Sequence, residues 1–316
     1  MDPRVERHAD IVVDTVAQVE QGDMVGLMIG PSAEPLEMAL YERIGQIGAT
    51  PYSIGGSSRA SRAFIRAIDN EEMQLPEHVL GFVEACDVLL QVRGGANISE
   101  LSDVDPQDMQ AYSQLQGPLI EAMRSDDLSV ALTQYPTTGY AQKAEMSTSG
   151  YEDFVWNAIN KDWDAQYEFQ QQLVDILDPA DEVRIVAGEE TDISMSIAGN
   201  PAINGVPVED VPSENLPGGE VFTAPIPDSV EGTVRFDMPV VRMGREVHDA
   251  YLEFEDGEVV EFDAERNVEV LEGILGTDDG ARRLGELGIG MNRDIDRFTY
   301  NMLFDEKMGD TVHMAV

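Results

Sequence analysis

Residues 22–30 have the sequence Gly-Asp-Met-Val-Gly-Leu-Met-Ile-Gly, and this stretch sets the fold class. Met24 to Ile29 form a short apolar run bounded by Gly22 and Gly30. A continuous apolar run of this length is the pattern of a strand that is buried on both faces, as in parallel sheets with helices on each side. The stretch therefore predicts a parallel α/β sheet near the start of the chain.

Helix and strand patterns alternate on both sides of that run. Apolar residues at helical spacing predict one helix over residues 5–19 and another over residues 36–47. Further strands are predicted at 51–54, 87–92 and 128–134, and further helices at 58–68, 77–85 and 106–124. Such an order implies a mostly parallel sheet covered by helices.

The pattern changes in the second half of the chain. One long helix is predicted from Glu152 to Leu177, and it ends at Asp178 because the following proline disfavours helical geometry. From Val183 onward short runs alternate between apolar and polar residues, and Asp256-Gly257 is typical of a hairpin turn. We place a domain boundary near Asp181, with an α/β domain over residues 1–181 and a strand-rich α+β domain over residues 182–316.

The chain is strongly acidic. Its 316 residues, enough for two domains, include 61 acids and 20 bases, which gives a formal charge of −41. Repulsion on this scale destabilises a compact protein at low ionic strength, whereas molar salt shortens the screening length to about 3 Å. We therefore predict a halophilic protein in a salt-rich cytoplasm. A content of 42% hydrophobic residues argues against a disordered acidic chain.

Composition also excludes several classes of function. The negative charge repels polyphosphate backbones, and no basic stripe offsets it, so nucleic-acid binding is not expected. Cys86 is the only cysteine, which excludes an internal disulfide and a cysteine-based zinc site, and its apolar surroundings predict a structural thiol. No apolar run approaches the roughly 20 residues that cross a bilayer, and Met1 to Asp14 lacks a signal-peptide core, so we expect no membrane association.

Residues 215–229 define the position of one carboxylate, Glu220. Their sequence is Asn-Leu-Pro-Gly-Gly-Glu-Val-Phe-Thr-Ala-Pro-Ile-Pro-Asp-Ser. Pro217 presets one backbone angle, Gly218 and Gly219 allow angles that other residues avoid, and residues 221–224 are predicted to be extended. A carboxylate held between a tight turn and a strand suits a metal ligand. The alternative in so acidic a chain is an ordinary solvated surface glutamate.

This stretch resembles the signature of the M29 aminopeptidases, a thermophilic family of two-metal exopeptidases. Three further segments are similar to motifs of that family, and they are residues 191–197, 280–286 and 305–315. Each motif alone is weakly specific, but four of them in the right order are a strong indication. The similarity covers roughly Val183 to Val316, while the first half of the chain agrees only in general layout.

The resemblance implies that Glu220, Glu286, Glu306 and His313 are metal ligands, with Glu286 in a catalytic role, either bridging or acid/base, and Asp305 orienting the ligands. It implies two divalent ions, and carboxylates with one imidazole suit zinc, cobalt or manganese. The implied activity is that of a metalloaminopeptidase, a hydrolase that cleaves the N-terminal peptide bond of peptides with a free N-terminus. A water activated by the two metals would carry out the hydrolysis. The pairing of family members into dimers implies a homodimer.

The histidines need separate treatment because the chain has four of them. A lone histidine in an apolar strand is most often a hydrogen-bonded core residue, and only the motif around His313 makes it a candidate ligand. His8, His78 and His248 stand in segments without ligand patterns. We expect these three to be surface or structural residues.

The end of the sequence leaves other readings open. In the family, a catalytic tyrosine and a late His-x-Asp metal pair follow the histidine segment, and this sequence stops at Val316 before them. We expect a chain truncated at its C-terminus, because residues 311–316 are apolar whereas chain ends are usually polar and exposed. The alternative function is a non-catalytic M29-like protein that binds peptides or metal without the last ligands. A third reading, a small-molecule-binding α/β protein, rests only on the layout of the first half.

Overall fold

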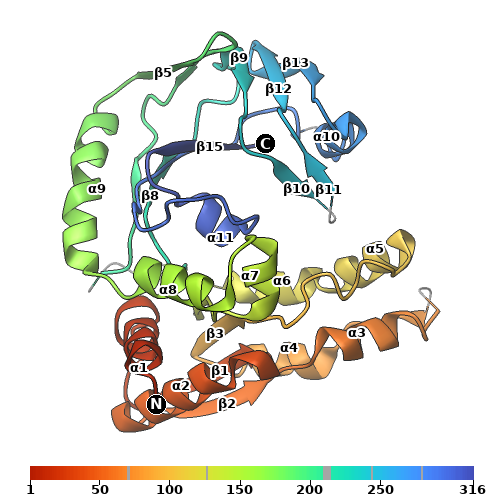
Figure 1. Ribbon diagram of the computed structural model, residues 1–316, viewed down its shortest axis with the longest axis vertical. Helices are drawn as coiled ribbons and strands as arrows, with labels where there is room; N and C mark the ends of the chain where they lie inside the picture. Colours follow the sequence, from red (N-terminus) through yellow and green to blue (C-terminus); the bar gives the residue numbers. More distant parts are fainter. Residues whose placement is uncertain (70–71, 126, 209–214, 243–244, 279) are drawn as a thin grey trace. The chain divides into compact units, whose positions relative to one another are not determined.

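The structure is a computed structural model that describes residues 1–69, 72–125, 127–208, 215–242, 245–278 and 280–316 (Figure 1). The chain forms two compact units. The first comprises residues 1–163 and 207–218, and the second comprises residues 164–206 and 219–316. The stretch over residues 205–217 is acidic and contains prolines, and this composition predicts a loop. Its residues 209–214 lie outside the described residues.

The first unit is built on a four-stranded parallel sheet with the strand order β2-β1-β3-β4. The strands are β1 (Met24–Ile29), β2 (Thr50–Ile54), β3 (Val88–Arg93) and β4 (Ser129–Gln134). Val25, Leu27 and Ile29 are buried, and β1 is a central strand with neighbours on both sides. The predicted parallel sheet is confirmed, and β1 has the bounds expected from its apolar run.

Helices accompany these strands along the first unit (Figure 1). They are α1 (Pro3–Asp10), its π-helical continuation η1 (Ile11–Val16), the 3-10 turn η2 (Pro31–Ala33), α2 (Glu34–Ile47), α3 (Ser58–Ile65), α4 (Glu77–Val83), α5 (Pro106–Leu115), α6 (Gly117–Met123), α7 (Thr138–Lys143) and α8 (Thr148–Ile159). Local chemistry defines their ends. The Asp2 side chain accepts a hydrogen bond from the Arg4 N–H at the start of α1, and Gly48 ends α2 in the left-handed conformation.

Two of the predicted helices are each divided in the structure. The helix expected over residues 106–124 is α5 followed by α6, because Pro118 has no N–H to donate and is favoured only in a first turn. The helix expected from Glu152 to Leu177 is α8 followed by α9 (Trp163–Leu177). Asn160 leaves the helical conformation, and Trp163 Nε1 donates to the Ile159 carbonyl at 3.0 Å, which satisfies the end of α8. The prediction of a single long helix from Glu152 to Leu177 was therefore wrong.

The second unit contains antiparallel sheets. A five-stranded sheet has the order β13-β12-β9-β6-β5, a four-stranded sheet has the order β15-β14-β8-β7, and β10 pairs with β11. The strands are β5 (Glu182–Ala187), β6 (Thr191–Ser196), β7 (Ile203–Gly205), β8 (Glu220–Thr223), β9 (Glu231–Arg235), β10 (Val240–Arg242), β11 (Arg245–Val247), β12 (Tyr251–Glu255), β13 (Glu258–Asp263), β14 (Glu286–Gly290) and β15 (Thr311–Ala315). Helices α10 (Val268–Leu275) and α11 (Met302–Asp305) complete the unit. The strand-rich second half is confirmed, and so is the hairpin at Asp256-Gly257, where both residues have positive φ.

The core of the second unit explains where the units divide. Val174 and Leu177 of α9 are buried in one hydrophobic cluster with Ile193, Val221 and Leu287 from the sheets. Helix α9 therefore packs with the strands from Asp164 onward, earlier in the chain than the boundary expected near Asp181. The boundary between independently folding domains at residue 181 stays a prediction.

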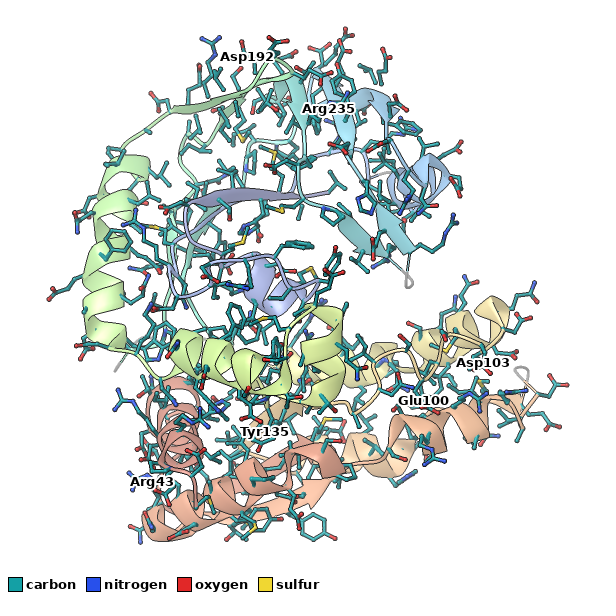
Figure 2. The ribbon with its side chains drawn as sticks, in the orientation of Figure 1. Arg43, Glu100, Asp103, Tyr135, Asp192 and Arg235 are labelled. Atoms are coloured by element: carbon teal, nitrogen blue, oxygen red, sulfur yellow. The ribbon has the colours of Figure 1, made fainter. Side chains whose placement is uncertain are left out.

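The surface carries many arginine–carboxylate pairs. Arg43 contacts Asp14 at 2.9 Å in the first unit, and Arg184 contacts Asp192 at 2.7 Å in the second. Figure 2 shows Arg43 and Asp192 on the outside of the ribbon. Each of these side chains is about a third exposed or more, so water and salt screen the pairs and each pair contributes little to stability.

Two expectations drawn from composition can be compared with the structure, one about Cys86 and one about membrane-spanning helices. Cys86 is partly buried, its Sγ donates to the Phe82 carbonyl, and burial raises the pKa of its thiol, which makes the thiolate scarce. None of the helices within the described ranges combines the length and the apolar composition needed to span a membrane.

Candidate metal centre

The predicted ligands meet on one face of the four-stranded sheet of the second unit. Residues directly opposite each other on paired strands share a face, and side chains alternate between faces along each strand. His313 of β15 lies opposite Gly288 of β14, and Gly288 lies opposite Phe222 of β8. Glu286 and Glu220 are each two residues from a member of this row, so they share its face.

Distances confirm that the side chains converge. The Nε2 atom of His313 lies 3.0 Å from Glu220 Oε2 and 3.6 Å from Glu286 Oε1. Glu306 follows α11, and its carboxylate contacts the Lys307 ammonium, which lies 2.9 Å from Glu220 Oε1. The structure thus brings together all of the residues expected to be ligands. Their role as ligands stays a prediction.

Glycine makes room for the histidine ring. A Cβ atom at Gly288 would lie 2.0 Å from His313 Nε2, so the imidazole covers the backbone of β14 where any side chain would stand. On the other side of Glu220, a Cβ atom at Gly205 would lie 3.2 Å from the Glu220 Cγ. Sequence reasoning missed both glycines. The signal for Gly288 was its place beside Gly290 at alternate positions of a strand, since glycine inside a strand often marks close approach of another group.

A buried lysine is the second residue that sequence reasoning missed. Lys307 is 1% exposed, and its ammonium contacts one carboxylate oxygen of Glu220 and one of Glu306. A buried ammonium requires such partners, because an unpaired charge is costly in a low-dielectric interior. The sequence did contain a sign of its importance, because lysine is rare in this chain. It occurs only three times, and one of these lysines directly follows Glu306.

Helix α9 supports the strand that carries Glu220. Gln170 is fully buried, and its Nε2 donates to the Glu220 backbone carbonyl and to Asn204 Oδ1, each at 2.8 Å. Gln166 in turn donates to Gln170 Oε1 at 2.8 Å, which fixes the orientation of the amide. This chain of hydrogen bonds holds the start of β8 against α9.

Asp305 ties down the turn before Glu306 and Lys307. Its Oδ1 accepts hydrogen bonds from the Thr299 N–H and hydroxyl, and its Oδ2 accepts one from the Asn301 N–H, all at 2.7 Å. These bonds fix α11 and thereby the residues that follow it. Asp305 was expected to orient the ligands, and the bonds found here give it a way to do so through the backbone.

The electrostatics of the cluster depend on burial and on pairing. Burial alone would raise the pKa of Glu220, but His313 and Lys307 outweigh this effect and lower it below its usual value. Burial alone would lower the pKa of His313, but the carboxylates of Glu220 and Glu286 raise it to about 9. Three carboxylates thus lie beside two cationic groups, which leaves an excess of negative charge that favours a bound cation.

The donor atoms fit a divalent metal. Glu220 Oε2 and both ring nitrogens of His313 are buried and have no hydrogen-bond partner in the described part of the chain, because the close contact between them lacks hydrogen-bond angles. No group of three or more His, Cys, Asp or Glu side chains among the described residues forms a site that could hold a metal ion. The chemistry and position of Glu220, Glu286 and His313 nevertheless suit the start of one.

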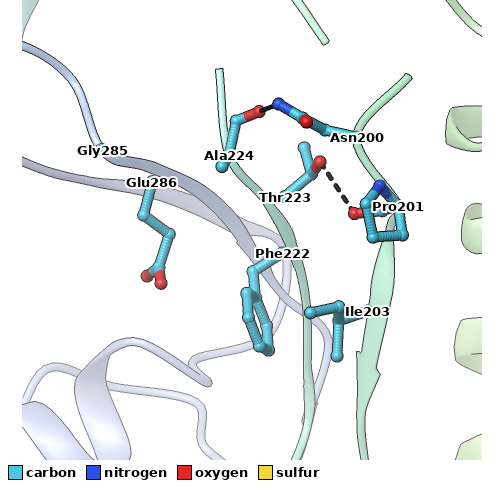
Figure 3. Close-up of a pocket in the computed structure, with 8 residues that line it drawn as sticks. All are labelled: Asn200, Pro201, Ile203, Phe222, Thr223, Ala224, Gly285 and Glu286. Carbon is cyan, nitrogen blue, oxygen red and sulfur yellow. Dashed lines mark hydrogen bonds between the residues drawn. The ribbon is translucent and has the colours of Figure 1, made fainter. Parts of the chain in front are cut away.

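A cavity of about 200 Å³ opens beside Glu286 on the same sheet. Figure 3 shows the side chains of Glu286, Phe222 and Ile203 pointing to the same side of the strands. The cavity is lined by Asn200, Pro201, Ile203, Phe222, Thr223, Ala224, Gly285 and Glu286. Glu286 therefore belongs both to the cluster around His313 and to this cavity.

The remaining histidines have the roles expected of them. His8 is fully buried and its Nε2 lies 2.8 Å from the Thr133 hydroxyl. His78 is exposed on α4, and His248 Nε2 contacts Glu246 at 2.9 Å. His8 is thus a structural residue, and His78 is a surface residue.

Comparison with known proteins places the whole chain in one group. A family model described as thermophilic metalloprotease (M29) matches residues 1–316. Aminopeptidase 2 of Geobacillus stearothermophilus is 42% identical over 106 residues, which are 32% of this chain and 25% of that protein. Aminopeptidase AmpS of Bacillus subtilis is 27% identical over 70% of this chain and 60% of its own length. Aminopeptidase PepS of Streptococcus thermophilus is 24% identical over 99% of this chain and 83% of its own length. The matches to the first of these relatives span a quarter of its length.

Solved structures share the fold. Wild-type AmpT from Thermus thermophilus matches with a TM-score of 0.86 and 23% identity, over 99% of this chain and 85% of that one. A dihydroxypyridine dioxygenase from Pseudomonas putida KT2440 matches with a TM-score of 0.57 and 14% identity, over 96% of this chain and 82% of that one. At these identities the likeness supports the architecture of both units and no particular chemistry.

Proposed function

The chain belongs to the M29 family of metalloproteases, and from that premise we propose that it is a metal-dependent aminopeptidase. The observation that carries the proposal is the convergence of Glu220, Glu286 and His313 on one sheet face, where the buried atoms Glu220 Oε2 and His313 Nε2 lie 3.0 Å apart without a hydrogen-bond partner in the described part of the chain. Relatives that are named aminopeptidases support the same activity. The alternative of a non-catalytic binding protein has no observation of its own in its favour.

Glu220, Glu286, Glu306 and His313 would hold two divalent ions, zinc, cobalt or manganese. When bound, the ions would polarise the scissile carbonyl and increase the acidity of water. The two glutamates differ in exposure, since the Glu220 side chain is 11% exposed and the Glu286 side chain is 40% exposed. Glu220 suits a fixed ligand, whereas Glu286 is accessible to substrate.

Glu286 is our candidate for the catalytic acid/base. Its carboxylate would accept a proton from the attacking water and return it to the leaving amine, a role that contributes about 10²–10⁴-fold in comparable sites. The excess of carboxylates around it would also attract the ammonium group of a free N-terminus. A peptide with a free N-terminus is therefore the expected substrate.

Three further properties belong to the same proposal. We propose a homodimer, following the family resemblance, and a salt-rich cytoplasm, which the formal charge of −41 supports. We also propose that residues 182–316 act as the catalytic domain. The position of all four candidate ligands in that range supports this assignment.

Release of p-nitroaniline from leucine p-nitroanilide tests the activity. The protein is assayed in molar potassium chloride with EDTA, and then with cobalt, zinc or manganese added. We expect release that depends on metal, that is lost with N-acetyl-leucine p-nitroanilide, and that falls at least about 100-fold in Glu286→Gln. Absence of metal-dependent release from a protein that binds metal would refute the enzyme and favour a binding protein.

A further inference from the structure

The cavity beside Glu286 continues the row of side chains that carries the metal cluster. Ile203 of β7 lies opposite Phe222 of β8, and Phe222 lies opposite Gly288, over which the His313 ring is placed. The row thus passes from an imidazole at one end to apolar side chains at the other. Glu286 lies between them, since it contacts His313 on one side and lines the cavity on the other.

Most of the side chains that line the cavity are apolar. Pro201, Ile203, Phe222 and Ala224 contribute hydrocarbon. The two polar side chains are turned to backbone carbonyls, because Asn200 Nδ2 donates to Ala224 O at 2.6 Å and Thr223 Oγ1 donates to Pro201 O at 3.0 Å (Figure 3). A ligand in this cavity therefore meets hydrocarbon on its walls and a carboxylate at its rim.

The size of the cavity fits one side chain. Sites for drug-sized ligands measure about 300–1,000 Å³, and this cavity of about 200 Å³ is smaller. A peptide whose terminal amine and first carbonyl lie at the Glu286–His313 cluster has one side chain within reach of the cavity, that of its first residue. We propose that this cavity binds the N-terminal side chain of the substrate and selects medium-sized aliphatic residues such as leucine and methionine. The inference rests on the proposed aminopeptidase function.

The cavity also excludes other classes of side chain. Acidic side chains meet the carboxylate of Glu286, which lines the cavity, and are disfavoured by like charge. Alanine leaves most of the cavity unfilled and loses the burial of three carbon atoms. Filling a hydrophobic pocket with one methylene is worth on the order of tenfold in kcat/KM, so leucine should exceed alanine by more than that.

Ile203→Asp is the variant that tests the cavity. Ile203 is 46% exposed on an edge strand, so the substitution should leave the fold intact. The new carboxylate should raise the ratio of kcat/KM for lysine over leucine p-nitroanilide on the order of tenfold. Val186→Asp is the matched control, because Val186 is 64% exposed on β5 of the same unit and does not line the cavity. Ala224→Leu should narrow the cavity and favour alanine over leucine.

Saturation-transfer NMR with L-leucinamide measures binding without turnover. We expect the leucine methyl protons to receive the strongest saturation in the wild-type protein, and that signal to fall in Ile203→Asp while it persists in Val186→Asp. An unchanged lysine-to-leucine ratio, or unchanged methyl saturation, in Ile203→Asp overturns the assignment of the cavity. Methyl saturation that depends on Ile203 in a protein without peptidase activity would support the cavity and refute the enzyme, so the two failures are distinguishable.

Discussion

Lys307 compensates charge at the centre of the cluster. Its ammonium holds one oxygen of Glu220 and one of Glu306, while the other oxygen of Glu220 faces His313. The lysine thereby directs Glu220 Oε2 toward the position of a metal. Removing it would leave two carboxylates close together without their shared cation.

Lys307→Met should therefore make the protein depend on metal for stability. In EDTA we expect a loss of about 3 kcal/mol of unfolding free energy, because breaking a buried ion pair leaves uncompensated charge. Added cobalt should restore more stability in the variant than in the wild type, since it replaces the missing positive charge. Thermal melts with and without metal measure both effects.

The control for Lys307→Met is Arg293→Met. Arg293 pairs with Asp310 at 2.8 Å, but both side chains are more than 60% exposed, so its loss should change the melting temperature only slightly. Equal melting temperatures of Lys307→Met and wild type in EDTA would show that Lys307 has no such role.

Buried His8, in the first unit, should make the free energy of unfolding depend on pH. Burial lowers the pKa of His8 to about 3, whereas the unfolded chain has the usual value of about 6.5. Between these values the unfolded state binds more protons, so the free energy of unfolding falls as pH falls, by about 1.4 kcal/mol per pH unit, and is constant above about pH 6.5. His8→Gln keeps a hydrogen-bonding group near Thr133 but cannot titrate.

Urea unfolding at pH 7.5, 5.5 and 4.5 tests this expectation. The difference in unfolding free energy between wild type and His8→Gln isolates the histidine from the many carboxylates that also titrate. That difference should shrink as the pH is lowered. A difference that stays constant across the three pH values would contradict a buried neutral His8.

At the scale of single elements, the pairing of β14 with β15 forms the seat of the histidine. The Gly288 backbone lies under the imidazole, and Gly288→Ala would place a methyl group 2.0 Å from His313 Nε2. The ring must move, so we expect metal affinity to fall by about 10–100-fold while both strands remain paired. Chelator competition with cobalt measures the affinity, and circular dichroism monitors the fold.

Gly285→Ala is the control on the same segment. A Cβ atom at Gly285 meets nothing closer than 3.8 Å, so the methyl group fits without movement. We expect the cobalt affinity of this variant to match that of the wild type. If Gly288→Ala binds cobalt as tightly as Gly285→Ala does, His313 is not a ligand in the place assigned to it.

The elements that the sequence predicted well are those with strong periodicity. The run over Met24–Ile29 and the turn at Asp256-Gly257 need only local chemistry, so their strands were found. The break between α8 and α9 depends on Asn160, whose Nδ2 donates to the Arg4 carbonyl 156 residues away, and no local pattern contains that contact. Helix periodicity alone therefore predicted one helix where two exist.

The same reasoning separates the predictable part of the site from the rest. Glu220, Glu286, Glu306 and His313 were found because they stand in short segments that resemble family motifs. Lys307 and Gln170 act through contacts with those residues in three dimensions, and the cavity beside Glu286 is formed by three separate segments of chain. Sequence motifs therefore identify the candidate ligand residues. The residues that hold and surround those ligands depend on how the strands pack, which no motif contains.

At the scale of the whole molecule, the net charge makes stability depend on salt concentration. The formal charge of −41 opposes compaction, and the exposed arginine pairs offset little of this repulsion because water screens them. Salt weakens both effects, but repulsion among 61 acids extends over many pairs while each ion pair is local. Screening should therefore stabilise the protein on balance.

The melting temperature should rise with potassium chloride between 0.1 M and 2 M. We expect an increase on the order of 10 °C, equivalent to a few kcal/mol for a protein of this size. Choline chloride at equal ionic strength should have a similar effect if screening is the cause, because screening depends on ionic strength and not on the identity of the cation. A melting temperature that stays level or falls over this range would show that the arginine–carboxylate pairs outweigh the repulsion, and the proposed salt-rich cytoplasm would lose its physical basis.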